Sequence, residues 1–196
     1  DSNKFKECAI EKAILKWNSH SRETFKAIEY FNINAGLSRK KKLSLFFGDV
    51  CVSNIMETYA QDCYDFFLEA KPTKGIKEFL EFIRKKNPNI KIFILSGGEE
   101  KEIKSFLENN FLIHFFEGIL ASEKTKVEHI EGMGVSDNDI FIGDSKNDLK
   151  TSLKTGLNFI LFEEYKSKKS YPKESLISEI LFKTKNFETL LSIIDL

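Results

Sequence analysis

Four short apolar runs in the second part of the chain constrain the fold more than any other feature. They lie at 90–95, 115–120, 140–142 and 157–162, and helical patterns or turns separate them. Runs of this length without polar alternation are typical of strands buried on both faces of a parallel sheet. Strands that alternate with helices in this way predict a doubly wound, mainly parallel α/β sheet with right-handed crossovers.

The helical segments have apolar residues at helical spacing, and the first seventy residues contain no convincing strand pattern. In this first part we predict helices at 5–17, 22–31, 38–47 and 53–68. In the later part we predict helices at 74–86, 99–107, 126–131, 145–155 and 187–194, with an edge strand at 179–182.

The composition limits the classes of protein that the chain can belong to. Its 196 residues are 41% hydrophobic, which suits one domain with a modest insertion and excludes a disordered chain. Thirty basic residues balance thirty acidic ones, so we expect no broad nucleic-acid surface. We also expect no membrane span, because no apolar run approaches 18 residues. Three cysteines without metal-ligand spacing predict a reducing, cytoplasmic compartment.

The segment at 141–149 contains the strongest chemical signal. A predicted strand ends at Gly143 and delivers Asp144, and Asp148 follows four residues later. Both carboxylates can therefore face one point across the first turn of a helix, as Mg²⁺ ligands would. The alternative is an ordinary helix start with an acidic cap.

Two further strand ends carry residues suited to binding a phosphate. Ser96, Gly97 and Gly98 place a hydroxyl and flexible backbone before a helix, although a plain turn has the same pattern. Lys124 and Lys126 follow the second apolar run, where a lysine can neutralise a phosphate. In a chain so rich in lysine, either of them can equally be a surface residue.

The order serine, lysine, Gly-Asp-x-x-x-Asp at successive strand ends resembles the haloacid dehalogenase superfamily of aspartyl phosphohydrolases. The segment at 75–80 resembles the helix before the second motif of that family. The resemblance covers most of the chain and implies a Rossmann-like sheet. The helical first third resembles the inserted α-helical cap of phosphoglycolate phosphatase-like and β-phosphoglucomutase-like members. It implies a cap at 14–72 and an α/β core formed by 1–13 and 73–196.

The resemblance also implies a mechanism with Mg²⁺ as the cofactor. A nucleophilic aspartate attacks phosphorus, and an aspartate two residues later acts as acid and base. Ser96 would bind the phosphate, and Asp144 and Asp148 would hold the metal, the second directly or through water. Lys126 is slightly preferred as the phosphate-binding lysine, whereas Lys124 fits the longer spacing of the family. The implied phosphate-binding group is completed by Gly97, Gly98 and Asn147.

The first motif of the family, Asp-x-Asp-Gly-Thr/Val, is not found in the sequence. Capped members continue from that motif into Asp-Ser, and this chain opens with Asp1 and Ser2, so we expect the nucleophile to lie upstream of Asp1. Its strand would be central in the sheet, and its loss would leave unpaired backbone groups that cost on the order of 1–3 kcal/mol each. Asp49 is not a substitute, because Cys51 stands where the second aspartate belongs.

The loop at 34–39 is the best candidate for contacting the rest of the substrate. Arg39 and Lys42 lie one helical turn apart and could meet an anionic or hydroxylated group, although a solvated basic face is the alternative. The Gly-x-Ser-Arg sequence that ends at Arg39 is similar to one in members linked to surface polysaccharides, which points to a sugar phosphate.

The predicted function is a Mg²⁺-dependent phosphatase for a small phosphorylated metabolite, working as a monomer or homodimer. A phosphomutase is the related alternative. A protein that binds a phosphorylated ligand without turnover is the alternative outside catalysis. A receiver-like regulatory domain fits poorly, because it would lack the helical insertion.

Overall fold

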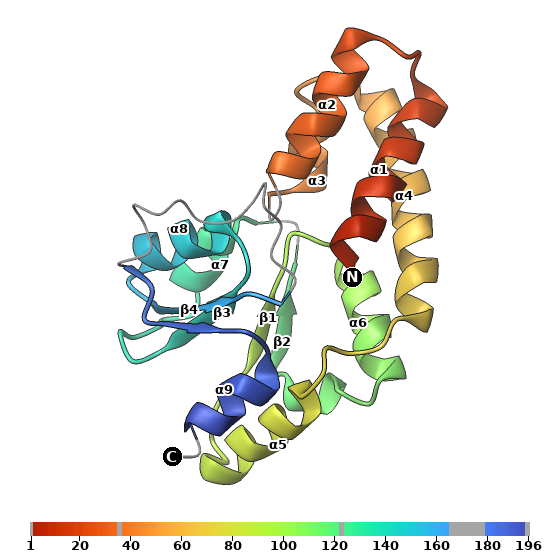
Figure 1. Ribbon diagram of the computed structural model, residues 1–196. Coiled ribbons are helices and arrows are strands. Elements are labelled where there is room, and N and C mark those ends of the chain that lie inside the picture. The colour runs from red at the N-terminus through yellow and green to blue at the C-terminus, as the bar shows by residue number, and fades with distance from the viewer. Residues whose placement is uncertain (1, 35–36, 122–123, 165–178, 195–196) are drawn as a thin grey trace.

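The computed structural model describes residues 2–34, 37–121, 124–164 and 179–194. Predictions that involve Asp1, Ala35, Gly36, Ser122 and Glu123 therefore lie outside the described residues. The described chain forms a helical part that stands over the strand ends of an α/β part (Figure 1).

The helical part is built from the first four helices. They are α1 (Ser2–Trp17), α2 (Arg22–Ile33), α3 (Arg39–Leu43) and α4 (Asp49–Glu69). The side chain of Ser21 accepts a hydrogen bond from the Thr24 N–H and so fixes the start of α2. Residues of α1, α2, α3 and α4 share one apolar cluster, which includes Ile10, Leu43 and Ile55. The helical nature of this part is thus as predicted.

Two of these helices have ends that differ from the prediction. α3 ends at Leu43 and not at 47, because the N–H groups of Phe46 and Phe47 both bond to the Leu43 carbonyl and form a turn. This turn lets Phe47 pack against the apolar cluster. α4 begins at Asp49 and not at 53, where an exposed carboxylate in the first turn suits the positive end of the helix dipole. Asp49 is therefore a helix-start residue and not the end of a strand.

The α/β part alternates strands and helices as predicted. Its helices are α5 (Ile76–Lys86), α6 (Glu100–Asn109), η1 (Ile113–Phe115), α7 (Lys126–Glu131), α8 (Lys146–Thr155) and α9 (Phe187–Ile194). Its strands are β1 (Phe93–Leu95), β2 (Gly118–Leu120), β3 (Ile140–Gly143), β4 (Asn158–Phe162) and β5 (Phe182–Thr184). The predicted edge strand at 179–182 is displaced, because pairing with β4 places Phe182 opposite Ile160.

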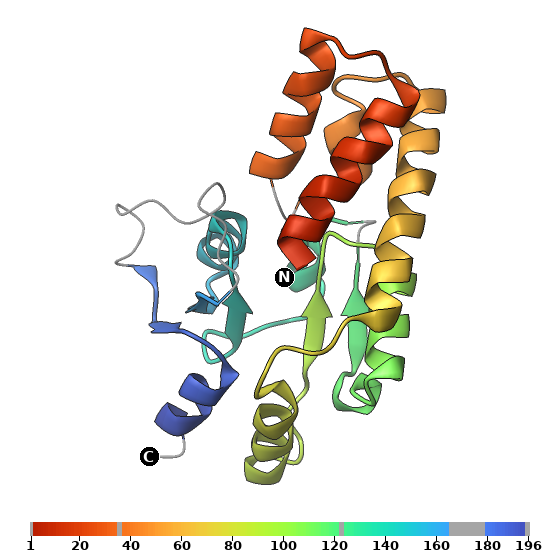
Figure 2. The same ribbon diagram turned by 45° about the vertical axis from the view of Figure 1, so that its right-hand side comes forward.

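The strands are all parallel to their neighbours, which confirms the predicted α/β class. In the described residues they form two sheets and not one: β1 pairs with β2, and β4 lies between β3 and β5. β4 is the most deeply buried strand, with Phe159 and Leu161 in an apolar cluster with Leu149. β1 and β3 point the same way and face each other across a gap between the two sheets, each at the edge of its own sheet (Figure 2).

Within the described residues, the facing edges of β1 and β3 have backbone groups without a strand partner. The Ile92 carbonyl and the Ser96 N–H bond to the β2 side, so Phe93 and Leu95 direct their N–H and C=O groups away from β2. By the same alternation, the Asp139 carbonyl bonds to the β4 side, and the polar backbone groups of Ile140 and Ile142 face the other way.

Side-chain burial shows the same incompleteness. Phe93 is 37% exposed and Ile140 is 56% exposed, although both belong to apolar runs predicted to be buried. In a parallel sheet, an interior strand normally pairs with a strand on each side, and both faces of the sheet are covered. Each of these strands therefore has the apolar character of an interior strand but the environment of an edge strand.

The predicted boundary after residue 13, between the α/β core and the cap, falls inside a continuous helix. α1 runs unbroken from Ser2 to Trp17 and packs along α4. Ala9 and Ile10 belong to the same buried cluster as Ala13 and Ile14. The helical part and the α/β part also meet where α4 packs on α6.

Candidate active site

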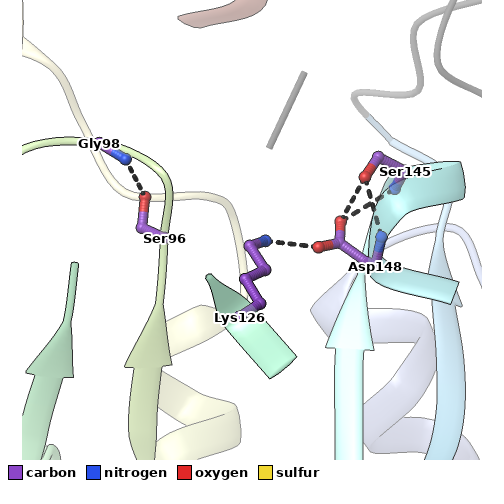
Figure 3. Close-up of polar contacts among 5 residues, drawn as sticks. All are labelled: Ser96, Gly98, Lys126, Ser145 and Asp148. Atoms are coloured by element: carbon purple, nitrogen blue, oxygen red, sulfur yellow. Dashed lines mark hydrogen bonds and ion pairs between the residues drawn. The ribbon is translucent and has the colours of Figure 1, made fainter. Parts of the chain in front are cut away.

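The carboxyl ends of β1 and β3 bring the sequence-predicted residues to one edge of the molecule. Ser96 follows β1 directly, and Asp144 follows β3 directly. Lys126 begins α7, and its side chain lies between Ser96 and Asp148 (Figure 3). In open parallel sheets the ligand binds outside this edge, so the arrangement places a candidate site here.

Ser96 is fixed by backbone contacts on both sides. Its N–H bonds to the Leu120 carbonyl of β2 at 3.0 Å, and its Oγ accepts a hydrogen bond from the Gly98 N–H at 3.0 Å. The hydroxyl therefore lies in a tight turn that leads into α6. A Cβ on Gly98 would lie 3.3 Å from Ser96 Oγ, so the turn is packed too closely for an easy substitution.

Asp148 is held in place by the start of α8. The Ser145 N–H and hydroxyl both donate to Asp148 Oδ2, at 3.2 and 2.7 Å, and the Asp148 N–H donates back to Ser145 Oγ at 3.2 Å. This reciprocal capping box fixes the first turn of the helix. A Cβ on Gly143 would come within 2.5 Å of Asp148 Cβ, which explains why glycine ends the strand.

Lys126 occupies the first position of α7 because Thr125 caps that helix. The Thr125 side chain accepts from the Glu128 N–H, and the Glu128 carboxylate accepts from the Thr125 N–H, which lowers the pKa of Glu128. Lys126 Nζ then lies 2.5 Å from Asp148 Oδ1, with the two side chains 14% and 5% exposed. A cation is unfavourable at a helix N-terminus, so its ion pair with Asp148 compensates for this position.

The two candidate lysines have different environments. Lys126 lies beside the strand ends, whereas Lys124 is exposed. His129 Nε2, on the same short helix, lies 2.8 Å from the Ala121 carbonyl oxygen, to which it donates. This hydrogen bond joins α7 to the residue that follows β2. Together with the Thr125 cap, it fixes the position of the helix that carries Lys126.

The carboxylates fit a magnesium site in part. Asp144 is partly buried at the end of β3, in the position where a strand-end ligand would lie. Asp148 has both oxygens engaged, one by Ser145 and one by Lys126, so the acidic cap considered as the alternative for this residue is present in the structure. No group of three potential ligands is found among the described residues. Mg²⁺ accepts one or two carboxylates with waters and substrate oxygens, so Asp144 can serve without such a group.

Arg39 and Lys42 are buried and not on a solvated basic face. Arg39 makes a two-bond ion pair with Glu102 of α6. Lys42 Nζ donates to the Phe31 carbonyl at 3.1 Å. Burial, and then the positive charge of Arg39, lower the pKa of Lys42 to about 7. Glu102 was not found from the sequence, because nothing in its local pattern distinguishes it from the other exposed-looking acids of α6. Asn147 lies in the first turn of α8, partly buried beside Asp148.

Comparison with known proteins identifies the family. Residues 3–162 match the haloacid dehalogenase-like hydrolases. The chain belongs to this family. A comparison with curated proteins gave no match. None of the described helices is long and apolar enough to cross a membrane.

Solved structures of this family share the fold at low sequence identity. CbbY from Rhodobacter sphaeroides, solved with phosphate, is 13% identical with a TM-score of 0.72 over 100% of this chain and 94% of its own. β-Phosphoglucomutase from Clostridium difficile is 17% identical with a TM-score of 0.71, over 100% and 90%. A predicted phosphatase from Clostridium acetobutylicum is 17% identical with a TM-score of 0.70, over 100% and 93%. The predicted α/β fold and the predicted family are thus confirmed.

Proposed function

We propose that this haloacid dehalogenase-like hydrolase is a Mg²⁺-dependent phosphatase that acts on a small phosphorylated metabolite. The observation that carries the proposal is the convergence of Ser96, Lys126 and Asp148 at one edge of two parallel sheets. An acidic helix cap or a surface lysine alone would not require a hydroxyl, a cation and a carboxylate from three separate strand ends to lie at the same edge. The neighbouring phosphatases and phosphomutase support the same chemical class.

In the proposed site the phosphoryl group lies against the Ser96 turn. The hydroxyl of Ser96 and the backbone of Gly97 and Gly98 bind its oxygens. Asn147, in the first turn of α8, completes this group. Lys126 offsets the negative charge that spreads over these oxygens during transfer. Lys124 is not needed, because it is exposed.

The metal-binding role falls mainly to Asp144. Asp148 orients Lys126 through its Oδ1 and can reach a metal only through water or after it releases that lysine. When bound, Mg²⁺ would act as a Lewis acid on the phosphoryl oxygens. We propose this division of roles in place of two equivalent carboxylate ligands.

The nucleophile is proposed to lie upstream of Asp1, on a strand that pairs with both β1 and β3. The edges at Phe93, Leu95, Ile140 and Ile142, which pair with no other described strand, support this position. A carboxylate oxygen at the end of that strand would attack phosphorus while the phosphorus–oxygen bond to the leaving group breaks. A second aspartate would give a proton to the departing oxygen and then take one from the water that hydrolyses the aspartyl-phosphate.

Arg39 is proposed to meet an anionic or hydroxylated group of the substrate beside the Ser96 turn, which suits a sugar phosphate. If the upstream motif is absent, the same site would bind a phosphorylated ligand without turnover. We also propose a reducing, cytoplasmic location, which the free thiols of Cys8, Cys51 and Cys63 support.

The test is phosphate release from a panel of sugar phosphates in Mg²⁺, using the chain together with the sequence encoded upstream of Asp1. We expect turnover that Asp144→Asn abolishes and that chelation of Mg²⁺ also abolishes. Conversion of one sugar phosphate into an isomer without release of phosphate would indicate a phosphomutase instead. Binding of the panel without either reaction would indicate the non-catalytic alternative.

A further inference from the structure

Arg39 and Glu102 form a buried ion pair between the two parts of the molecule. The helical part, α1 to α4, is called the cap below, and the α/β part is called the core. Arg39 lies on α3 and Glu102 on α6, 63 residues apart in the sequence. Arg39 Nη1 and Nη2 lie 2.6 and 2.8 Å from the two carboxylate oxygens, and the side chains are only 6% and 5% exposed. A parallel pair of this kind restricts both the distance and the angle between the groups that carry it.

The cap holds the other side of the guanidinium. The Arg39 guanidinium carbon lies 4.7 Å from the ring centroid of Tyr59 on α4, and Tyr59 in turn packs edge-on against Phe31 of α2. A guanidinium over an aromatic ring is stabilised further when water is excluded, as it is here. Arg39 is therefore in contact with the cap through Tyr59, and its carboxylate partner belongs to the core.

The ion pair lies directly against the Ser96 turn. A Cβ placed on Gly98 would be 3.4 Å from Arg39 Nη2, 3.3 Å from Ser96 Oγ and 3.8 Å from Glu102 Oε2. One glycine thus separates the cap arginine from the strand-end hydroxyl. A guanidinium has five N–H donors, and within the described residues the pair with Glu102 uses two of them, which leaves donors for a further acceptor.

Two further basic side chains lie near Arg39, and Glu102 is the carboxylate that pairs with the arginine. Lys6 of α1 and Lys42 of α3 are close enough to Arg39 for its charge to lower the pKa of each, after the larger effect of burial. Although burial opposes its charged form, the pKa of Arg39 is raised, because Glu102 bonds to it. The helical part therefore gathers two lysines near the buried Arg39, and Glu102 supplies the carboxylate that compensates the arginine.

We propose that Glu102 is a positioning residue that fastens the cap to the core and holds Arg39 beside the phosphate-binding turn. Removing its charge leaves a buried guanidinium without its partner, which is costly, and favours separation of α3 from α6. In the fastened state the remaining donors of Arg39 add to those of the Ser96 turn. This second consequence rests on the proposed function, whereas the fastening of the cap does not.

The test combines backbone hydrogen exchange with a titration of inorganic phosphate. In Glu102→Gln we expect the amides of Lys42 in α3 and of Ser44 at its C-terminal cap to exchange about tenfold faster or more, and phosphate to bind about tenfold more weakly. Glu100→Gln is the matched control, since Glu100 is an exposed residue on the same helix, and it should change both quantities less than twofold.

The outcomes separate the inference from the proposed function. A purely local role would accelerate exchange in α6 and leave α3 unchanged, and that result would overturn the inference. Ser96→Ala should weaken phosphate binding without changing α3; if phosphate binding is unaffected, the proposed function fails while the cap result stands. If Glu102→Gln does not fold, Arg39→Lys replaces it, because it keeps the charge and loses the two-bond geometry. Unchanged α3 exchange in that variant also overturns the inference.

Discussion

Lys126 Nζ lies 2.5 Å from Asp148 Oδ1, although the two residues lie in the first turns of different helices and are 22 positions apart. The contact joins the start of α7, after β2, to the start of α8, after β3. Each helix start is fixed separately by its own capping box, so the ion pair is not needed to form either helix. The lysine lies where the dipole of its helix disfavours it, and a phosphate would relieve that disadvantage.

Lys126→Met is expected to weaken inorganic phosphate binding by about 10- to 100-fold, because a charge-assisted contact to the anion is lost. Lys124→Met is the matched control and should bind phosphate as the unmodified protein does, since Lys124 is exposed. Calorimetric titration measures both. Equal losses in the two variants would contradict the assignment of Lys126.

Loss of Lys126 also removes a partner from the buried carboxylate of Asp148, so stability must be measured separately. We expect Lys126→Met to be destabilised in urea and the double variant Lys126→Met, Asp148→Asn to regain part of that loss. Phosphate binding should not recover with it. If binding recovers together with stability, the lysine acts through folding and not through contact with the anion.

Gly143→Ala is expected to lower the free energy of unfolding by about 1–3 kcal/mol, because the new methyl group overlaps Asp148. Its Cβ would come within 2.5 Å of Asp148 Cβ and 2.8 Å of Asp148 Cγ. Gly132→Ala is the control, since the nearest atoms to its Cβ would be at an ordinary 3.5 Å. Urea unfolding of both variants is the measurement, and an equal effect of the two would show that Asp148 moves aside without cost.

The open edges of β1 and β3 predict an uneven exchange of backbone amides. Phe93, Leu95, Ile140 and Ile142 have N–H groups that face away from their paired strands, so they should exchange faster than Ile94 next to them. Hydrogen exchange resolved by residue measures this directly. In the chain extended by its upstream sequence, the same four amides should become protected. Protection without the extension would show that another segment already pairs there.

The sequence was sufficient to predict the class of fold because the apolar runs and helix signals agree with the final environment of most elements. It was less successful at ends: α3 is shorter than its apolar pattern indicates, since the Phe46 and Phe47 amides turn back to Leu43. The division of the sheet could be expected only from the family resemblance. Nothing in the run at 90–95 itself distinguishes a paired edge from an open one.

The candidate site was predictable where its residues follow strands, and less so where distant helices meet. Ser96 and Asp144 follow from the strand-end rule alone. The different environments of Lys124 and Lys126 could not be read from the sequence, because they depend on Thr125 as the cap that makes Lys126 the first residue of α7. Glu102 could not be predicted, since its partner Arg39 comes from another part of the chain. Ion pairs across domains depend on packing that local patterns do not encode.

The buried Lys42 predicts that stability rises with pH from about pH 7. Its pKa is lowered to about 7 by burial, then by the charges of Arg39 and Lys6, while its ordinary value is 10.5. Above pH 7 the unfolded chain therefore keeps a proton that the folded chain has lost, and the free energy of unfolding increases by at most about 1.4 kcal/mol per pH unit. The lowered pKa of Lys6 acts in the same direction.

The increase should slow near pH 9, where other groups begin to oppose it. Burial raises the pKa of Cys63 above 9.0 and that of Tyr59 above 10.0, so from about pH 9 the unfolded chain loses the Cys63 proton first, which offsets the gain from Lys42, and from about pH 10 the same effect of Tyr59 adds to this opposition. Urea unfolding at pH 7, 8 and 9 measures the rise. Lys42→Met should flatten the curve, because Met carries no charge to desolvate, whereas the exposed Lys41→Met should leave its slope unchanged. A slope that persists in Lys42→Met would assign the pH dependence to groups other than Lys42.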